Sequence, residues 1–314
     1  MKKLLIIRFS ALGDVAMLAP VVCAAAKQNP EVQITVLSQQ RMADLFADMP
    51  KNVVFHGVDL KQQSLREIVF GLGTFDAVAD MHGVWRSRYI SMAMLLRGAQ
   101  VRTIQKGRFA RFLLTCGMWH RPLKHMSLRY SNVLNGLGLT RIALDAPSMR
   151  AGKGIGIAPF AAHEGKIYPI ERMEQVVELL SKRGERIVLF GGGEKEQTVL
   201  DSWAKKYNGV ETIAGKKSLR EELDVIRGLR VMVSMDSANM HLASLVGTRV
   251  VSIWGATHPN AGFLGSGQNE GDCIQRELKC RPCSIYGNRK CKFGDYRCMD
   301  IAPEEIVAKV MEEK

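Results

Sequence analysis

The sequence has 314 residues, of which 46% are hydrophobic, enough for one large core or two of ordinary domain size. The formal net charge is +13, and most of the excess lies in residues 1–150, with 20 Lys and Arg against 9 Asp and Glu. Residues 151–314 hold 24 against 22. We therefore expect the first half to meet a polyanion, such as nucleic acid or phosphorylated glycolipid, although a basic solvated face without a partner would have the same composition.

Residues 1–8 resemble the basic and apolar regions of a signal peptide. Arg8 interrupts the apolar run and no cleavage-site pattern follows, so we expect a buried strand there. No stretch approaches the roughly 18 to 20 apolar residues that cross a bilayer, and no lipidation motif is evident. These features predict a soluble, cytoplasmic protein.

Short runs rich in Val and Ile alternate with amphipathic stretches, which predicts the α/β class with parallel sheets and crossover helices. The predicted strands are 4–9, 32–37, 53–56, 75–79, 101–104, 154–158, 186–190, 210–213, 231–235 and 250–254. Pro, Gly and polar residues predict a linker at 144–154 between domains of residues 1–150 and 151–314. Because parallel sheets bind ligands at the carboxyl ends of their strands, we expect two domains that face each other across a cleft.

The segment from Arg8 to Asp14 combines a strand end, a turn at Gly13 and the start of a helix. Asp14 follows the strand at the place where an open α/β sheet exposes its ligands. Its carboxylate can cap the helix or act as a general base on a hydroxyl. The residues alone leave both interpretations open.

Two loops of the second half also follow predicted strands. One, at 157–169, carries Lys166, which can reach a phosphate as a point charge or simply be solvated. The other has three glycines before Glu194 and Glu196, and either carboxylate can accept hydrogen bonds from a ribose. The glycines lack the spacing of the dinucleotide fingerprint.

The strand at 231–235 leads through Asp236 and Ser237 into a predicted helix. The free N–H groups and the positive dipole end of such a helix suit a pyrophosphate. His241 lies one turn into the helix, where it is either a core residue or close to the nucleotide.

These segments, in this order, resemble the lipopolysaccharide heptosyltransferase family, glycosyltransferases of family 9 with the GT-B fold of two Rossmann-like domains. The most specific part is Asp236-Ser237-x-x-x-His241-Leu242-Ala243 with Gly255-x-Thr257-x-Pro259 downstream, followed by Ser10-x-Leu12-Gly13-Asp14. The resemblance spans nearly the whole chain.

The resemblance implies that Asp14 is the catalytic base. It also implies that Lys166, which precedes Tyr168-Pro169 where the family has Trp-Pro, contacts the phosphates of the donor. At 238 the family usually has Gly, and alanine restricts positive φ, so the loop is expected to be altered. Taken together, the residues and the resemblance give the expected donor contacts Lys166, Glu196, Asp236, Ser237, Ala238, Asn239 and His241.

The stretch from Asp80 to Arg88 is similar to a family segment on the acceptor side. Acidic sugars or phosphates of a lipid-A-type acceptor are therefore expected to bind to first-half arginines. The candidates are Arg86, Arg88, Arg108 and Arg111.

The expected reaction is inverting transfer of a sugar, by resemblance heptose from ADP-heptose, onto a lipopolysaccharide core acceptor. No Asp-x-Asp pair occurs in a suitable loop, so we expect cationic groups in place of a divalent metal and no catalytic cofactor. The enzyme is expected at the inner face of the inner membrane, in peripheral contact with its anionic surface.

Two other classes compete with this interpretation. A sugar-nucleotide epimerase would use the same architecture without an acceptor. A zinc-stabilised nucleic-acid-binding protein would fit the charge, but the sequence has no recognisable nucleic-acid module, and no nucleic-acid partner is expected.

The segment 273–298 is rich in cysteine and basic residues. Its C-x2-C-x7-C-x6-C spacing is compatible with a tetrahedral structural zinc site. A cytosolic compartment argues against disulfides, which leaves structural zinc or reduced thiols. The four candidate ligands are Cys280, Cys283, Cys291 and Cys298.

Overall fold

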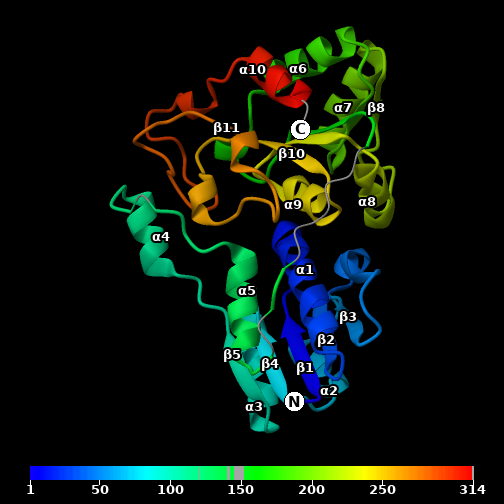
Figure 1. Cartoon of the computed structure of the whole chain (residues 1–314), viewed down its shortest axis with the longest axis vertical. Coiled ribbons are helices and arrows are strands. Elements are labelled where there is room, and N and C mark those ends of the chain that lie inside the picture. The colour runs from blue at the N-terminus through cyan, green and yellow to red at the C-terminus, as the bar shows by residue number, and fades with distance from the viewer. Residues whose placement is uncertain (120, 140–141, 145–151, 313–314) are drawn as a thin grey trace. The chain divides into compact units, whose positions relative to one another are not determined.

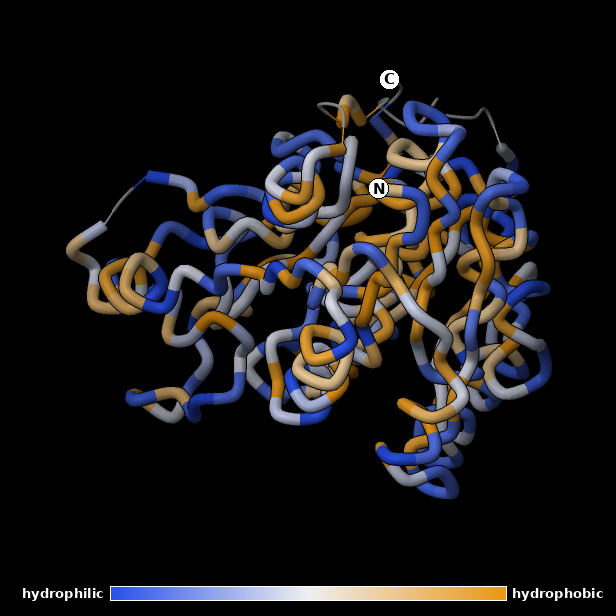
Figure 2. Tube along the Cα trace, turned by 90° about the horizontal axis from the view of Figure 1, so that it is seen from below, coloured by the Kyte–Doolittle hydropathy of each residue, from blue (hydrophilic) through white to orange (hydrophobic). Residues whose placement is uncertain are grey.

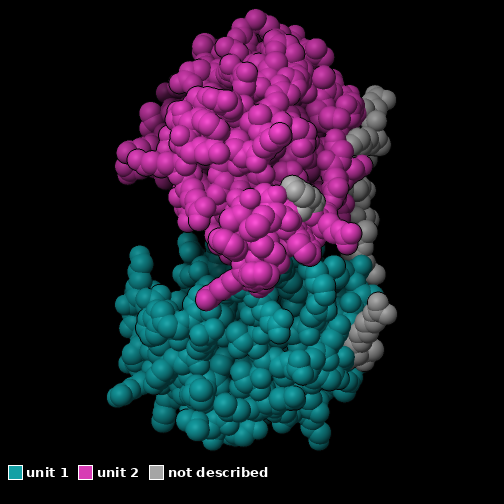
Figure 3. Space-filling model, turned by 90° about the vertical axis from the view of Figure 1, so that its left-hand side faces the viewer, with its two compact units in different colours: residues 1–106, 124–145 teal, residues 107–123, 146–314 magenta. Residues whose placement is uncertain are grey.

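The computed structural model describes residues 1–119, 121–139, 142–144 and 152–312. The chain divides into two compact units, which Figure 3 distinguishes by colour: unit 1 contains Met1–Lys106 and Lys124–Asp145, and unit 2 contains Gly107–Leu123 and Ala146–Lys314. Segment 107–123 therefore differs from the expected division, because it belongs to unit 2. The predicted boundary between residues 150 and 151, with most of the predicted linker, lies outside the described residues.

Unit 1 is built on a parallel sheet with the strand order β3-β2-β1-β4-β5 (Figure 1). Its strands are β1 (Lys3–Ile7), β2 (Gln33–Gln39), β3 (Val53–Val58), β4 (Ala77–Asp80) and β5 (Gln100–Thr103). Its helices are α1 (Leu12–Gln28), α2 (Leu65–Gly71), α3 (Trp85–Leu96) and α5 (Met126–Asn135). The central strand β1 pairs on both sides, with Leu5 opposite Thr35 of β2 and Val78 of β4.

Unit 2 is built on a second parallel sheet, with the order β11-β10-β9-β6-β7-β8. Its strands are β6 (Ile155–Ala158), β7 (Ile187–Leu189), β8 (Val210–Thr212), β9 (Val231–Met235), β10 (Arg249–Trp254) and β11 (Cys273–Gln275). Its helices are α4 (Arg108–Thr115), α6 (Ile170–Lys182), α7 (Glu194–Lys206), α8 (Leu219–Arg227), α9 (Ala238–Leu245) and α10 (Pro303–Met311). The predicted α/β class and all ten predicted strands are confirmed, with small shifts at the ends; β11 was not predicted.

The central strands are largely apolar and buried because helices cover both faces of a parallel sheet. All five residues of β9 and all six of β10 are buried. In Figure 2 the apolar segments run mainly through the interior of the trace, and the loops at its margins are mostly hydrophilic. None of the helices in the described part of the chain combines the length and apolar character that a membrane crossing requires.

Each sheet reverses its strand order beside its first strand. The chain leaves β1 toward β2 and β3 but later adds β4 and β5 on the other side of β1, and unit 2 does the same around β6 and β9. At such a switch point the loops at the carboxyl ends of the two neighbouring strands diverge and leave a crevice for ligands. The loops after β1 and β4, and those after β6 and β9, are therefore the places where functional side chains are expected.

A buried ion pair fastens the C-terminal helix of unit 2 to its sheet. Nη2 of Arg249, at the start of β10, lies 2.8 Å from Oδ1 of Asp272, and the two side chains are 9% and 2% exposed. The same guanidinium donates to the carbonyl oxygens of Lys309 and Glu312 at the end of α10. The four hydrogen bonds that this guanidinium donates offset the free-energy cost of burying its charge.

We predict that Asp272→Ala lowers the free energy of unfolding by about 3 to 5 kcal/mol, because it leaves the Arg249 charge buried without its counterion. Urea denaturation followed by circular dichroism measures this. The matched control is Asp201→Ala, which breaks the exposed Lys216–Asp201 pair and should cost at most about 1 kcal/mol. Equal effects of the two substitutions would contradict the prediction.

Candidate active-site residues in the two units

Asp14 lies in the first turn of α1, just beyond the carboxyl end of β1. Its Oδ2 is 2.7 Å from Nη2 of Arg8, and the two side chains are 22% and 8% exposed, respectively. The same oxygen accepts a hydrogen bond of 3.3 Å from the backbone N–H of Ala11, the residue that precedes α1. The capping role considered from the sequence is therefore present, and the carboxylate is also held by a guanidinium while part of it stays open to solvent.

Arg8 is itself fixed by residues from distant parts of unit 1. Its Nη1 donates to the carbonyl oxygen of Met81, which follows β4. Its guanidinium lies over the ring of Tyr130, 5.6 Å from the centroid, and the Tyr130 hydroxyl donates to the backbone oxygen of Asp14 at 3.3 Å. β1, β4 and α5 thus together orient the Arg8–Asp14 pair.

The loop after β4 lies beside this pair. Asp80 is fully buried, and its Oδ1 accepts the backbone N–H groups of His82 and Gly83, which fixes the turn. Nδ1 of His82 lies 3.5 Å from the backbone N–H of Phe9. Burial, reinforced by the nearby charges of Arg8 and Lys106, lowers the pKa of His82 to about 4. His82 is therefore a neutral imidazole at neutral pH.

The four arginines expected at the acceptor fall into two groups. Arg86 and Arg88 are exposed on the first turn of α3, directly after the β4 loop, and the Arg86 guanidinium lies over the Trp85 ring. Arg108 is exposed at the start of α4 in unit 2.

Arg111 differs from the expected solvent-facing cation. It is 8% exposed, and its Nη1 donates to the hydroxyl of Tyr286 at 2.7 Å. The guanidinium also lies over the rings of Phe263 and Tyr286. These contacts attach α4 to the rest of unit 2.

Lys166 and Asp236 meet at the switch point of unit 2. Lys166 ends the short 3₁₀ turn that follows β6, and Asp236 directly follows the adjacent strand β9. Nζ of the lysine is 2.8 Å from Oδ2 of the aspartate, with side-chain exposures of 14% and 7%. Two of the expected donor contacts are thus brought together as a mostly buried ion pair.

The loop that carries Lys166 is packed from two sides. The backbone N–H of Ala256 donates to the carbonyl oxygen of Gly165 at 2.8 Å. On the other side, a Cβ at Gly287 would lie 2.6 Å from Cγ of Lys166, and Gly287 has a φ of +74°. Only glycine meets both conditions, so the Cys-rich segment packs closely against the stem of the lysine.

The start of α9, beside this pair, lacks a side-chain cap. Its N-cap, Ser237, makes no side-chain capping bond, and its Oγ lies 3.2 Å from Oγ of Ser234 instead. Ala238 is the first helical residue and does not adopt a positive φ, so the alanine fits here and the expected alteration of the loop is not needed. Asn239 follows in the same turn, and His241 is 7% exposed within α9.

Glu196 takes part in its own glycine turn. It lies in the first turn of α7, and its Oε2 accepts the backbone N–H of Gly192 at 2.7 Å. The structure thus gives this carboxylate a local partner in addition to the ribose contact expected from the sequence.

The four cysteines do not form the expected zinc site. Within the described ranges, which include all four thiols, no group of three or more His, Cys, Asp or Glu side chains could hold a metal ion. The Cys283 thiol donates to the carbonyl oxygen of Cys280. Burial raises the pKa of the Cys298 thiol to about 11, which keeps it protonated. The structure therefore does not support the zinc prediction, because matching spacing did not bring the sulfurs into one coordination sphere.

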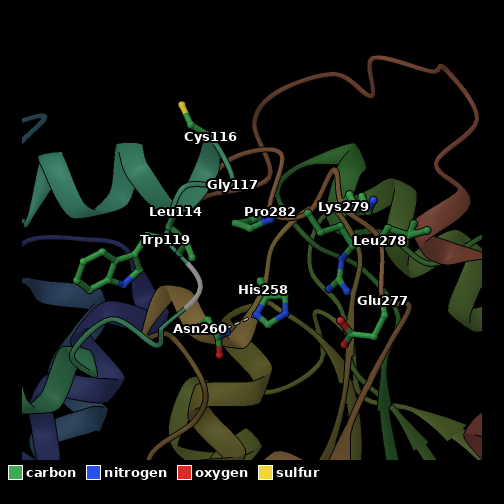
Figure 4. A pocket seen from close by; sticks show the side chains of 11 residues that line it. Leu114, Cys116, Gly117, Trp119, His258, Asn260, Glu277, Leu278, Lys279 and Pro282 are labelled. Carbon is green, nitrogen blue, oxygen red and sulfur yellow. Dashed lines mark hydrogen bonds between the residues drawn. The ribbon is translucent and has the colours of Figure 1, made fainter.

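A pocket of about 730 Å³ lies within unit 2, and no pattern in the sequence predicts it. Figure 4 shows Trp119 and the end of α4 on one side and the chain from Glu277 to Pro282 on the other, with His258 between them. Nδ1 of His258 accepts the backbone N–H of Asn260 at 3.0 Å. His258 belongs to the motif after β10, so the pocket adjoins that motif.

Several residues that organise these sites were missed from the sequence. Arg281 is buried and donates to the carbonyl oxygens of Trp254, Gly255 and Thr257, which fixes the loop after β10. The hydroxyl of Thr257 is buried and has no hydrogen-bond partner among the described residues. Arg8 and Thr257 carried a usable signal, since Arg8 opens the segment that ends in Asp14 and Thr257 belongs to the Gly255-x-Thr257-x-Pro259 motif; Arg281 carried none.

Two parallel α/β units, each with charged residues at the reversal of strand order, are the architecture of a GT-B glycosyltransferase. Residues 137–293 match the profile of glycosyltransferase family 9 (heptosyltransferase). That match covers half of the chain, and the chain belongs to this family. It is therefore a glycosyltransferase.

Individual relatives agree with this assignment. Lipopolysaccharide heptosyltransferase 3 of Escherichia coli is 23% identical over 282 residues, with 78% of this chain and 81% of the relative covered. A solved structure of E. coli heptosyltransferase WaaC with ADP-2-deoxy-2-fluoro heptose has a TM-score of 0.64 at 20% identity, over 91% of this chain and 97% of that chain. The family 9 glycosyltransferase from Veillonella parvula has a TM-score of 0.73 at 18% identity, over 98% and 96%.

We predict that the NMR signals of the His82 ring titrate near pH 4 and that Lys106→Met moves the midpoint upward, since one of the cations that disfavour imidazolium is removed. The unfolded chain binds this proton near pH 6.5 and the folded chain does not, so stability should fall as the pH drops from about 6.5 to 4. His82→Gln assigns the signal and should remove this part of the acid sensitivity. A midpoint near 6.5 in the unmodified protein would contradict the prediction.

Proposed function

We propose that this chain transfers heptose from ADP-heptose to a lipopolysaccharide core acceptor, with inversion at the anomeric carbon and without a catalytic metal. The observation that carries the proposal is the Lys166–Asp236 pair at the β6/β9 switch point, beside the uncapped start of α9. The names of the relatives support the choice of substrates, because they are lipopolysaccharide heptosyltransferases and one was solved with a fluorinated ADP-heptose.

Unit 2 would bind the donor. A nucleoside diphosphate placed at the start of α9 accepts hydrogen bonds from the free N–H groups of the helix and gains from its dipole. Lys166 adds a point charge, and Ser237, Asn239 and His241 lie in the first turns of α9 or at its N-cap. The hydroxyl of Thr257 follows β10, the strand next to β9. Glu196 would bind the ribose with the carboxylate capacity left after its bond to Gly192.

Asp14 would act as the general base in unit 1. Its carboxylate takes the proton from the acceptor hydroxyl while the hydroxyl oxygen attacks the anomeric carbon and the bond from that carbon to the diphosphate oxygen breaks. The electron pair of the broken bond leaves with the nucleoside diphosphate. One displacement inverts the anomeric configuration, and Arg8 holds the carboxylate in place.

The departing diphosphate gains negative charge as its bond to the sugar breaks. Lys166 and the amides of α9 supply fixed positive charge where it develops, the task that a divalent cation performs in other transferases. The chain has no Asp-x-Asp pair in a suitable loop to hold such a cation.

The acceptor would be held by exposed cations. Arg86 and Arg88 follow the β4 loop of unit 1, and Arg108 is exposed on α4, so all three can meet phosphates of a lipid-A-type acceptor. Arg111 supports them indirectly by anchoring α4. Because such an acceptor resides in a membrane, we propose a cytoplasmic enzyme in peripheral contact with the anionic inner face of the inner membrane.

We predict that the purified protein releases ADP from ADP-heptose only when a heptose-free lipopolysaccharide core is added, and that a chelator does not stop it. Asp14→Asn should lower turnover by about 10² to 10⁴-fold with ADP affinity changed at most a few-fold, because only the base is lost. A coupled assay for ADP and calorimetry measure both quantities.

The control for Asp14→Asn is Asp59→Asn in an exposed loop of the same unit, which should keep normal turnover. Near-normal turnover of Asp14→Asn would show that Asp14 serves only as a helix cap. If the protein converts the nucleotide sugar without an acceptor, the transferase proposal is wrong and the chain acts as an epimerase.

We predict that Lys166→Met weakens ADP binding by about tenfold or more and slows transfer, because one cation facing the diphosphate is lost and Asp236 is left without its counterion. Isothermal titration calorimetry measures the affinity. Lys195→Met, an exposed lysine on α7, is the matched control and should bind ADP normally. Unchanged affinity in Lys166→Met would show that the lysine serves only the fold.

A further inference from the structure

Helix α3 presents a row of large apolar side chains to solvent. Trp85, Tyr89, Met92 and Leu96 follow one another at intervals of four, three and four residues, which places them along one face of the helix. Their exposed fractions lie between 43% and 83%. We call these four residues the α3 stripe.

The α3 stripe is not the side of the helix that the core requires. Ile90 and Met94, with Ser87 and Ser91, are the buried residues of α3 and already supply its packing face. In α8, by comparison, Leu223 and Ile226 are buried and the outer side carries charges. The outer face of α3 therefore has an apolar character that folding of unit 1 does not explain.

Along the sequence, basic residues surround the stripe and no acidic residue does. Residues 81–144 contain 11 Lys and Arg and not one Asp or Glu, whereas residues 1–80 contain eight of each sign. Arg86 and Arg88 flank the stripe at its start, and Arg97 lies at its end. Nη1 of Arg97 donates to the carbonyl oxygens of Val69 and Leu72, which fixes that charge beside the last turn of α3.

This combination fits one kind of partner. Phosphate headgroups pair with the arginines, and the boundary between headgroups and acyl chains accepts an apolar stripe that contains Trp and Tyr. A nucleic acid would leave Met92 and Leu96 without apolar contacts. A second copy of the chain would oppose arginines with arginines. The charge complementarity thus favours an anionic lipid surface.

We propose that the α3 stripe is a membrane-docking surface, which lies in the interface of an anionic phospholipid bilayer with its side chains among the upper acyl groups. The inference deepens the proposed function and rests on it for its purpose, since α3 begins directly after the β4 loop that adjoins Asp14. Docking through α3 brings that loop to the headgroup layer, where the sugar of a glycolipid acceptor is found.

The test is co-sedimentation of the full chain with vesicles of phosphatidylglycerol and phosphatidylcholine, without nucleotide or acceptor. The variant changes all four stripe residues to Ser, and the control changes two other exposed apolar residues of unit 1, Val54→Ser and Leu128→Ser. We expect the stripe variant to bind at least about tenfold more weakly, the control to bind normally, and pure phosphatidylcholine to bind the unmodified protein weakly.

A second measurement does not depend on how well the four-fold variant folds. Brominated lipids should quench part of the tryptophan fluorescence, and Trp85→Phe should abolish that part while vesicle binding is retained. Trp203 and Trp254 are buried and cannot supply the signal, and the exposed Trp119 is replaced by Phe in every protein compared, so that it cannot supply the signal either. Quenching that persists in Trp85→Phe would overturn the proposal.

The vesicle assays are independent of catalysis, so they distinguish the two proposals. Suppose that the stripe variant loses vesicle binding and that the unmodified protein has no transferase activity. This result would support the docking surface and reject the proposed function. ADP affinity should be equal in the stripe variant and the unmodified protein. Unaltered vesicle binding by the stripe variant, or a dimer that only this variant converts to monomer, would overturn the docking proposal.

Discussion

The reversal of strand order beside β1 and beside β6 is the constraint on which both candidate sites depend. A charge on a strand of a sheet covered by helices needs a buried partner, as Arg249 of β10 has in Asp272. Where neighbouring loops diverge, charged side chains can reach solvent without disturbing the core. Arg8 and Asp14 use that freedom in unit 1, and Lys166 and Asp236 use it in unit 2.

Both pairs join a cation and a carboxylate that lie between the core and solvent, where electrostatic interactions are stronger than at an exposed surface. They are supported differently. Arg8 is held by Met81 and Tyr130, so the guanidinium is the fixed member and orients the carboxylate. In unit 2 the loop of Lys166 is packed against Ala256 and Gly287, which ties the lysine to the Cys-rich segment.

The strands of both sheets were predictable because most of them contain short runs rich in Val and Ile. The motifs at the ends of β1, β6 and β9 indicated where Asp14, Lys166 and Asp236 lie in their own sheets. Properties that depend on distant partners were not predictable. Burial of Arg111 requires Tyr286, 175 positions away, and β11 has three residues, too few for a periodic pattern. The zinc prediction relied on spacing, which does not determine where sulfurs lie in space. The α3 stripe was hidden because apolar residues lie on both the buried and the exposed sides of the helix, so no amphipathic pattern distinguishes the two sides.

In the proposed donor site, the Lys166–Asp236 pair would also select among the anions that enter it. Lys166 already has a carboxylate 2.8 Å away, so an entering anion competes with a partner that is part of the protein and loses no entropy in binding. A singly charged anion would only take the place of the Asp236 carboxylate at Lys166, so its binding would gain little free energy. A diphosphate carries enough charge and enough oxygens to engage the lysine and the amides of α9 together. Selectivity for a diphosphate over the small anions of a cell would then arise from a negative charge placed inside an anion site.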